Sequence, residues 1–128
     1  MYADALVELI DLFRGERRYN KQLRDAALQA IDEAVVATRA YEARVGHNEN
    51  GNPKQENRDR GEEVRIGGLW QKAAMKTADV SPDFSHVLYD KALYWFREFE
   101  WTAEEVIARK IDWDSIENRI RVLLTDRA

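Results

Sequence analysis

The feature that most constrains the fold is the spacing of residues along segment 2–45, which contains no proline and a single glycine, Gly15. A strict 4,3 spacing runs through it at Leu6, Ile10, Phe13, Arg17, Asn20, Arg24, Ala27, Ile31, Ala34, Thr38, Tyr41 and Val45. Because this spacing puts side chains on one face of an α-helix, it predicts a long helix or a coiled-coil element. Polar residues occupy the face just after Gly15, so we expect a kink or short break near residues 15–20.

The length of this segment has a consequence for its first residues. An unbroken helix over 2–45 would be about 66 Å long, against about 33 Å for the helix expected over 58–79. The excess carries Leu6, Leu9, Ile10 and Phe13, which form an apolar face too large to leave in water. We therefore expect this face to fold back on the bundle or to bind another chain, and these four residues are candidate partner-binding residues.

A polar stretch, residues 46–61, separates the first helix from the next. It holds three glycines, four asparagines and Pro53, a composition that predicts a surface loop near residues 46–57. The following helix places Ile66, Trp70, Ala73 and Thr77 on its inner face. Two glycines at 67 and 68 disfavour a helix by about 1 kcal/mol each relative to alanine. Either they let a neighbouring helix approach closely near Trp70, or the helix is interrupted there.

Residues 89–101 are the most aromatic part of the chain, with six of its thirteen aromatic side chains. At about 100° per residue, a helix places one apolar stripe at Phe84, Leu88, Ala92, Trp95 and Phe99. Tyr89 and Phe96 lie at the edge of that stripe. We interpret the whole set as the core face of a bundle helix that packs against Trp70 and Tyr41.

Tyr94 and Trp101 lie away from this stripe and allow two interpretations. Exposed aromatic side chains are frequent anchors of protein interfaces, which makes both residues candidate partner-binding residues. In the other interpretation, they form a second apolar face that the C-terminal helices cover.

Capping chemistry predicts three further helix starts, in which a side-chain oxygen accepts from a free amide of the first turn. The signals are Ser81 followed by Pro82, and capping-box spacings at Thr102–Glu105 and Asp114–Glu117. The last helix carries one apolar face, formed by Trp113, Ile116, Ile120 and Leu123. The chain is therefore expected to be all-α: one domain over 1–128, an antiparallel bundle of about four to five helices with a long or kinked N-terminal helix.

Composition limits the chemistry that this chain can carry. It has no cysteine, which excludes disulfides and thiolate sites, and a net charge of −4, which disfavours global attraction to nucleic acid. No segment is apolar for the roughly 20 residues of a membrane span, so we expect a cytoplasmic protein without membrane contact. Asp83 and His86 share helical i,i+3 spacing, but with so few histidines we predict neither a metal site nor a cofactor. No catalytic residues are predicted.

The strongest local charge is in residues 14–24, with five bases, Arg14, Arg17, Arg18, Lys21 and Arg24, and one acid. Most of them recur at helical spacing, so they form either a solvated helix face or a patch for phosphate or an acidic partner. We expect a non-enzymatic interaction or accessory protein that binds a protein partner or a second copy of itself through the N-terminal helix. Nucleic-acid binding through the basic residues, with Arg58 and Arg60, is the less favoured function, and a metal-dependent enzyme the least favoured.

Overall fold

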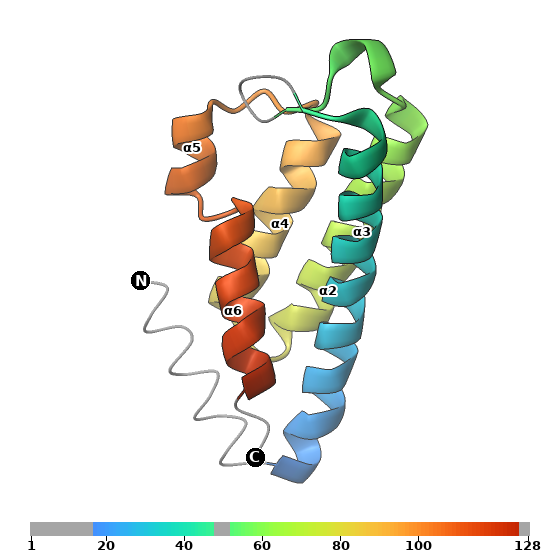
Figure 1. Ribbon diagram of the computed structural model, residues 1–128. Coiled ribbons are helices and arrows are strands. Elements are labelled where there is room, and N and C mark those ends of the chain that lie inside the picture. Colours follow the sequence, from blue (N-terminus) through green and yellow to red (C-terminus); the bar gives the residue numbers. More distant parts are fainter. Residues whose placement is uncertain (1–16, 48–51, 126–128) are drawn as a thin grey trace.

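The computed structural model describes residues 17–47 and 52–125. Their elements are α2 (Arg17–Val45), the 3₁₀ helix η1 (Gln55–Asn57), α3 (Arg60–Ala78), α4 (Pro82–Phe96), α5 (Ala103–Ala108) and α6 (Trp113–Thr125). Figure 1 shows α2, α3, α4 and α6 running in alternating directions, with the short α5 at one end. The predicted all-α antiparallel bundle with a long first helix is therefore confirmed for the residues described, which contain no β-strand.

The closest helix packing in the bundle lies between α3 and α4. Helix α3 continues without interruption through Gly67 and Gly68. A Cβ atom on Gly67 would lie 2.7 Å from the Phe96 ring, so the missing side chain is what lets this ring reach the α3 backbone. Gly68 faces open space. Of the two predicted roles of this glycine pair, close approach is confirmed for Gly67, and the ring that approaches is that of Phe96.

The predicted apolar stripe of α4 forms the centre of the core. All five predicted members, Phe84, Leu88, Ala92, Trp95 and Phe99, are buried. However, α4 ends at Phe96, so Phe99, with a φ of 64°, reaches the core from the turn after the helix and not from its stripe. The ring of Trp95 meets Tyr41 edge-on at a centroid distance of 5.7 Å, as expected. Trp70 is also buried, and its indole N–H donates to Thr38 Oγ1 at 2.9 Å. The prediction for Tyr89 was wrong: at the edge of the stripe, this residue is 45% exposed.

A buried carboxylate, Glu63 in the first turn of α3, joins the loop to two helices. Its Oε2 accepts from the Tyr41 hydroxyl at 2.5 Å and from Arg58 Nε at 2.8 Å, and its Oε1 accepts from Arg58 Nη2 at 2.7 Å. The Tyr41 hydroxyl accepts in turn from the backbone N–H of Asp59 at 2.9 Å. Burial by itself raises the pKa of Glu63, but hydrogen bonds from Arg58 and Tyr41 outweigh it and lower this pKa.

Arg60 extends the network to the end of α4. Its Nη1 atom lies 3.3 Å from Glu63 Oε1 and donates to the carbonyl of Trp95 at 2.8 Å, while Nη2 donates to the carbonyl of Phe96. The last carbonyls of a helix lack partners within that helix, and a cation there also suits the helix dipole. Arg60 therefore fastens the C-terminal end of α4 to the first turn of α3.

The helix starts agree with the predictions in two cases out of three. Ser81 caps α4, and Thr102 with Glu105 forms a reciprocal capping box on α5. The box predicted at Asp114 was wrong, because Asp112 accepts from the Ser115 backbone N–H and hydroxyl and α6 begins at Trp113, two residues earlier than expected. The helix expected to resume near Arg58 begins at Arg60, after the cap of Asp59.

Helix α2 is continuous from Arg17 to Val45. The break expected near residues 15–20 is therefore not found in the described part, from residue 17 onward, and residues 15 and 16 lie outside it. Within the described ranges, none of the helices has the length and apolar character needed to cross a bilayer.

The two adjacent glycines of α3 provide a matched test of the close approach. We expect Gly67→Ala to lower the free energy of unfolding by roughly 1–3 kcal/mol, because its new methyl group overlaps the Phe96 ring. Gly68→Ala should raise it by roughly 0.5–1 kcal/mol, because the helix gains propensity at no steric cost. Urea denaturation of both variants measures the difference, and equal effects would contradict this packing.

Neighbouring glutamates test the buried network. We expect Glu63→Gln to lower the free energy of unfolding by roughly 3 kcal/mol at neutral pH, since Arg58 loses its buried charge partner. Glu62→Gln, which breaks a surface pair with Arg65, should change it by less than about 1 kcal/mol. The lowered pKa of Glu63 means that its stabilisation is present above the ordinary pKa of 4.5 and is lost as the pH falls through the folded value. The Glu63→Gln deficit should therefore shrink in acid.

Candidate functional site

A groove of about 680 Å³ lies between the first half of α2 and the helix α6. Its apolar lining comes from Leu28, Ile31 and Val35 of α2 and Ile120 of α6. Ile31 is buried and the other three are partly buried. The polar lining comes from α2 and consists of Lys21, Arg24, Asp25, Gln29 and Asp32. A groove with an apolar floor and a charged rim is the kind of surface that receives an amphipathic helix.

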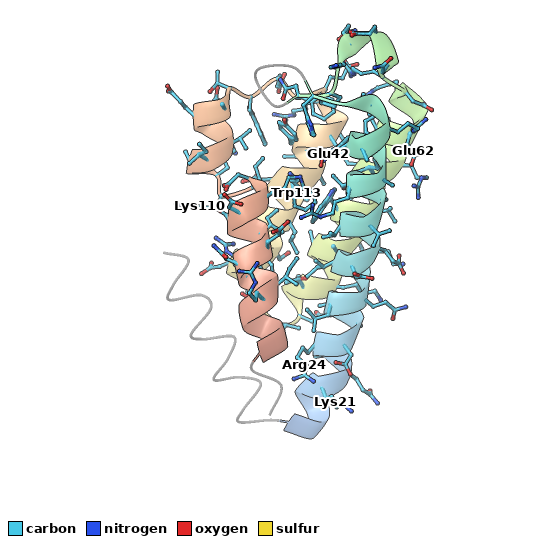
Figure 2. The ribbon with its side chains drawn as sticks, viewed as in Figure 1. Lys21, Arg24, Glu42, Glu62, Lys110 and Trp113 are labelled. Carbon is cyan, nitrogen blue, oxygen red and sulfur yellow. The ribbon has the colours of Figure 1, made fainter. Side chains whose placement is uncertain are left out.

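The groove exists because long side chains near the start of α6 dock this helix on α2. Trp113 Nε1 donates to Glu42 Oε1 at 2.8 Å, and Figure 2 shows these two side chains pointing toward each other from α6 and α2. The Arg39 guanidinium lies 4.5 Å from the centre of the Trp113 ring and also pairs with Glu117. The backbone of α3 lies close to α2 and α4, whereas α6 meets α2 mainly through these side chains. Beyond Glu117 the two helices leave the groove between them.

A second polar centre surrounds Lys91 of α4, which is only 5% exposed. Its Nζ atom donates to the Ile111 carbonyl at 2.9 Å and lies 5.0, 5.5 and 5.8 Å from the ring centres of Trp113, Tyr94 and Trp70. Burial lowers the pKa of Lys91 to about 8, against the opposing charges of Glu42 and Asp112. Lys91 thus ties the connection between α5 and α6 to α4, within an aromatic enclosure.

The structure describes only part of the predicted binding residues. Leu6, Leu9, Ile10, Phe13 and Arg14 lie outside the described residues, and only the backbone is described for Arg17 and Arg18. Lys21 and Arg24 both line the groove, at the end of α2 where Figure 2 labels them. Arg24 reaches the carboxylate of Asp25 at 3.4 Å. Two members of the predicted basic patch are thereby placed on the groove.

Of the other two predicted anchors, Trp101 is buried in the core and Tyr94 is partly buried against it. Their rings stack at a centroid distance of 6.3 Å, and Trp101 is 9% exposed. The Tyr94 hydroxyl donates to Asn52 Oδ1 at 2.6 Å, which fastens the loop before α3 to α4. Burial raises the pKa of Tyr94 to about 12. These contacts favour the second interpretation, in which Tyr94 and Trp101 form an apolar face that other parts of the same chain cover.

The remaining candidates from the sequence are not gathered into a site. Arg58 and Arg60 are held by Glu63, Glu98 and the end of α4. Asp83 and His86 are both exposed on α4. Within residues 17–47 and 52–125, no group of three or more histidine, aspartate or glutamate side chains is arranged to hold a metal ion.

Sequence reasoning missed the residues that widen the apolar face of α2. Leu28 and Val35 come directly after Ala27 and Ala34, which are positions of the 4,3 series. A wider helix face, with three apolar positions in every seven residues, would have included them. Lys91 was also missed. The signal was its position four residues from both Val87 and Trp95, which are buried on the same helix face.

Comparison with protein-family models, with curated proteins and with solved structures found no significant match to this chain.

The pH dependence of stability tests the position of Lys91. Its pKa is lower in the folded protein than the ordinary value of 10.5, so between about pH 8 and 10 the unfolded chain holds the extra proton. Stability should therefore rise across this range, by roughly 2 kcal/mol. The range stops at pH 10 because folding raises the pKa values of Tyr41 and Tyr94 to about 12. Above pH 10 these two hydroxyls lose their protons more readily in the unfolded chain, which lowers stability.

Urea denaturation at several pH values measures this rise. We expect Lys91→Met to abolish it and Lys76→Met, at an exposed position of α3, to retain it. An unchanged pH dependence in Lys91→Met would show that another group causes the rise.

Proposed function

We propose that this protein is a non-enzymatic helical interaction protein that self-associates through the apolar face of its N-terminal segment. The observation that carries the proposal is the groove between α2 and α6, with its apolar floor of Leu28, Ile31, Val35 and Ile120. The sequence before α2 contains apolar side chains that could pack on this apolar floor.

That sequence has the spacing of a groove-binding helix. Leu6, Leu9, Ile10 and Phe13 stand at positions i, i+3, i+4 and i+7, which is the pattern of anchors in helix-in-groove recognition. Burying four such side chains contributes on the order of 6–12 kcal/mol, which is comparable to the cost of joining two chains. We therefore expect an association that depends on protein concentration.

Nucleic-acid binding through residues 14–24 has less support. Its strongest feature is Lys21, which is exposed on the groove rim. However, Asp25 and Asp32 line the same rim, and Arg58 and Arg60 serve the network around Glu63. A mixed-charge rim gives little of the positive field that a phosphate backbone requires.

Light scattering over a range of concentrations tests the proposed self-association. We expect the wild-type mass to rise toward that of a dimer, and Leu9→Glu with Ile10→Glu to keep the protein monomeric because two acids replace apolar anchors. Met75→Glu is the matched control, since Met75 is 69% exposed on α3 and its change should leave the association intact. A wild-type protein that is monomeric at every concentration would refute the proposal.

A further inference from the structure

We infer that α5 and α6 form one unit that detaches from the bundle and unfolds while α2, α3 and α4 stay packed. The opening begins after α4 ends at Phe96, and it uncovers the aromatic enclosure of Lys91. It is independent of the proposed self-association, because it involves the residues after α4 and needs no second copy.

The helices α2, α3 and α4 have their own connections. The network around Glu63 fastens one end of them through side chains of α2, the loop and α3 and the last carbonyls of α4. Further along, Trp70 of α3 donates to Thr38 of α2, and the Ser85 hydroxyl of α4 donates to the Ala74 carbonyl of α3 at 2.6 Å. These bonds remain in place when the last two helices leave.

The attachment of α5 and α6 is concentrated in a few places. Helix α5 has no buried residue, and Figure 1 shows it at one end of the bundle, apart from α2 and α3. Helix α6 is held at its start by the bond from Trp113 to Glu42 and by the bond from Lys91 to the Ile111 carbonyl, and further along by the buried Ile116.

Detachment of these helices means that they unfold. Helix α5 has 6 residues and α6 has 13, and isolated helices shorter than about 12–15 residues are marginal in water. Neither helix therefore keeps its hydrogen bonds once it has left the other three. The opening is a partial unfolding, and its free energy lies below that of global unfolding because most of the core stays buried.

Strained turns flank α5 and favour the opening. Glu98 and Phe99, which follow α4, have φ values of 56° and 64°, and Lys110, which follows α5, has a φ of 60°. A residue with a Cβ atom is disfavoured in this left-handed region relative to glycine. The strain is released when the segment after α4 unfolds.

The charge of Lys91 makes the opening depend on pH. The titratable groups that face it are Glu42 of α2, Asp112 before α6 and Tyr94 of α4 itself, whereas α3 contributes the ring of Trp70. Opening returns the ammonium group to water. The pKa of Lys91 is about 8 in the closed form and has its ordinary value of 10.5 in the open form, which therefore holds the extra proton between about pH 8 and 10. Opening should become rarer by roughly 30-fold as the pH rises across this range.

Labelling of buried thiols tests the opening, because the chain has no cysteine of its own. The matched variants are Ile116→Cys on α6 and Ile66→Cys on α3, since both isoleucines are fully buried. At pH 8 we expect an aromatic disulfide reagent to label the Ile116→Cys thiol at least roughly 10-fold faster than the Ile66→Cys thiol. Its rate should also depend less on urea, because partial unfolding exposes less surface. Corrected for the thiolate fraction, this rate should fall roughly 30-fold from pH 8 to 10.

Equal labelling rates with the same urea dependence would show that the chain opens only as a whole, which overturns the inference. Fast labelling of the Ile116→Cys thiol without the pH dependence would also overturn it, since Lys91 would then stay enclosed. Hydrogen exchange of the unmodified protein compares amides of α6 with amides of α3 without any substitution, so the test survives a variant that folds poorly. In that measurement, α6 amides that exchange only through global unfolding contradict the opening.

Discussion

The carboxylate of Glu63 is the group on which the arrangement of α2, α3 and α4 depends. It is fully buried, and such a group is stable only when its oxygens are paired. Its partners come from three places: Tyr41 near the end of α2, Arg58 in the loop and Arg60 in the first turn of α3. Arg60 then continues to the last carbonyls of α4. One charge thus sets the relative position of three helix ends, and removing it leaves two guanidinium groups without their buried partner.

Helix α6 is held in a different way, and the difference produces the groove. Helices α3 and α4 pack where the Phe96 ring lies against the backbone at Gly67, whereas α6 meets α2 through the long side chains Trp113, Glu42 and Arg39. Lys91 adds a bond from α4 to the connection before α6. These contacts concentrate at the start of α6. Further along, α2 and α6 enclose a space that neither fills, with an apolar floor and a mixed-charge rim.

The proposed function depends on this space and on the segment that precedes α2. The groove accounts for the position of Lys21 and Arg24, which belong to its rim. The stack of Tyr94 on Trp101 shows why an aromatic-rich helix need not be a binding surface: Tyr94 donates to Asn52 of the loop, and the Arg109 guanidinium after α5 covers the Trp101 ring. The proposed self-association rests on this groove and on the apolar spacing of Leu6, Leu9, Ile10 and Phe13 in the sequence before α2.

The sequence by itself determined the helices, because apolar periodicity and capping chemistry are local: it predicted the core stripe from Phe84 to Phe99 and the caps at Ser81 and Thr102. The local pattern failed where the surroundings of a residue decide its role. Tyr89 lies at the edge of the stripe but is exposed, and Asp112, not Asp114, caps α6. Only the tertiary structure decided the partners of Glu63, the burial of Lys91 and the groove beside Leu28 and Val35. These depend on how far apart two helices pack, and that distance is set by side chains distant in the sequence, such as Gly67 with Phe96 and Glu42 with Trp113.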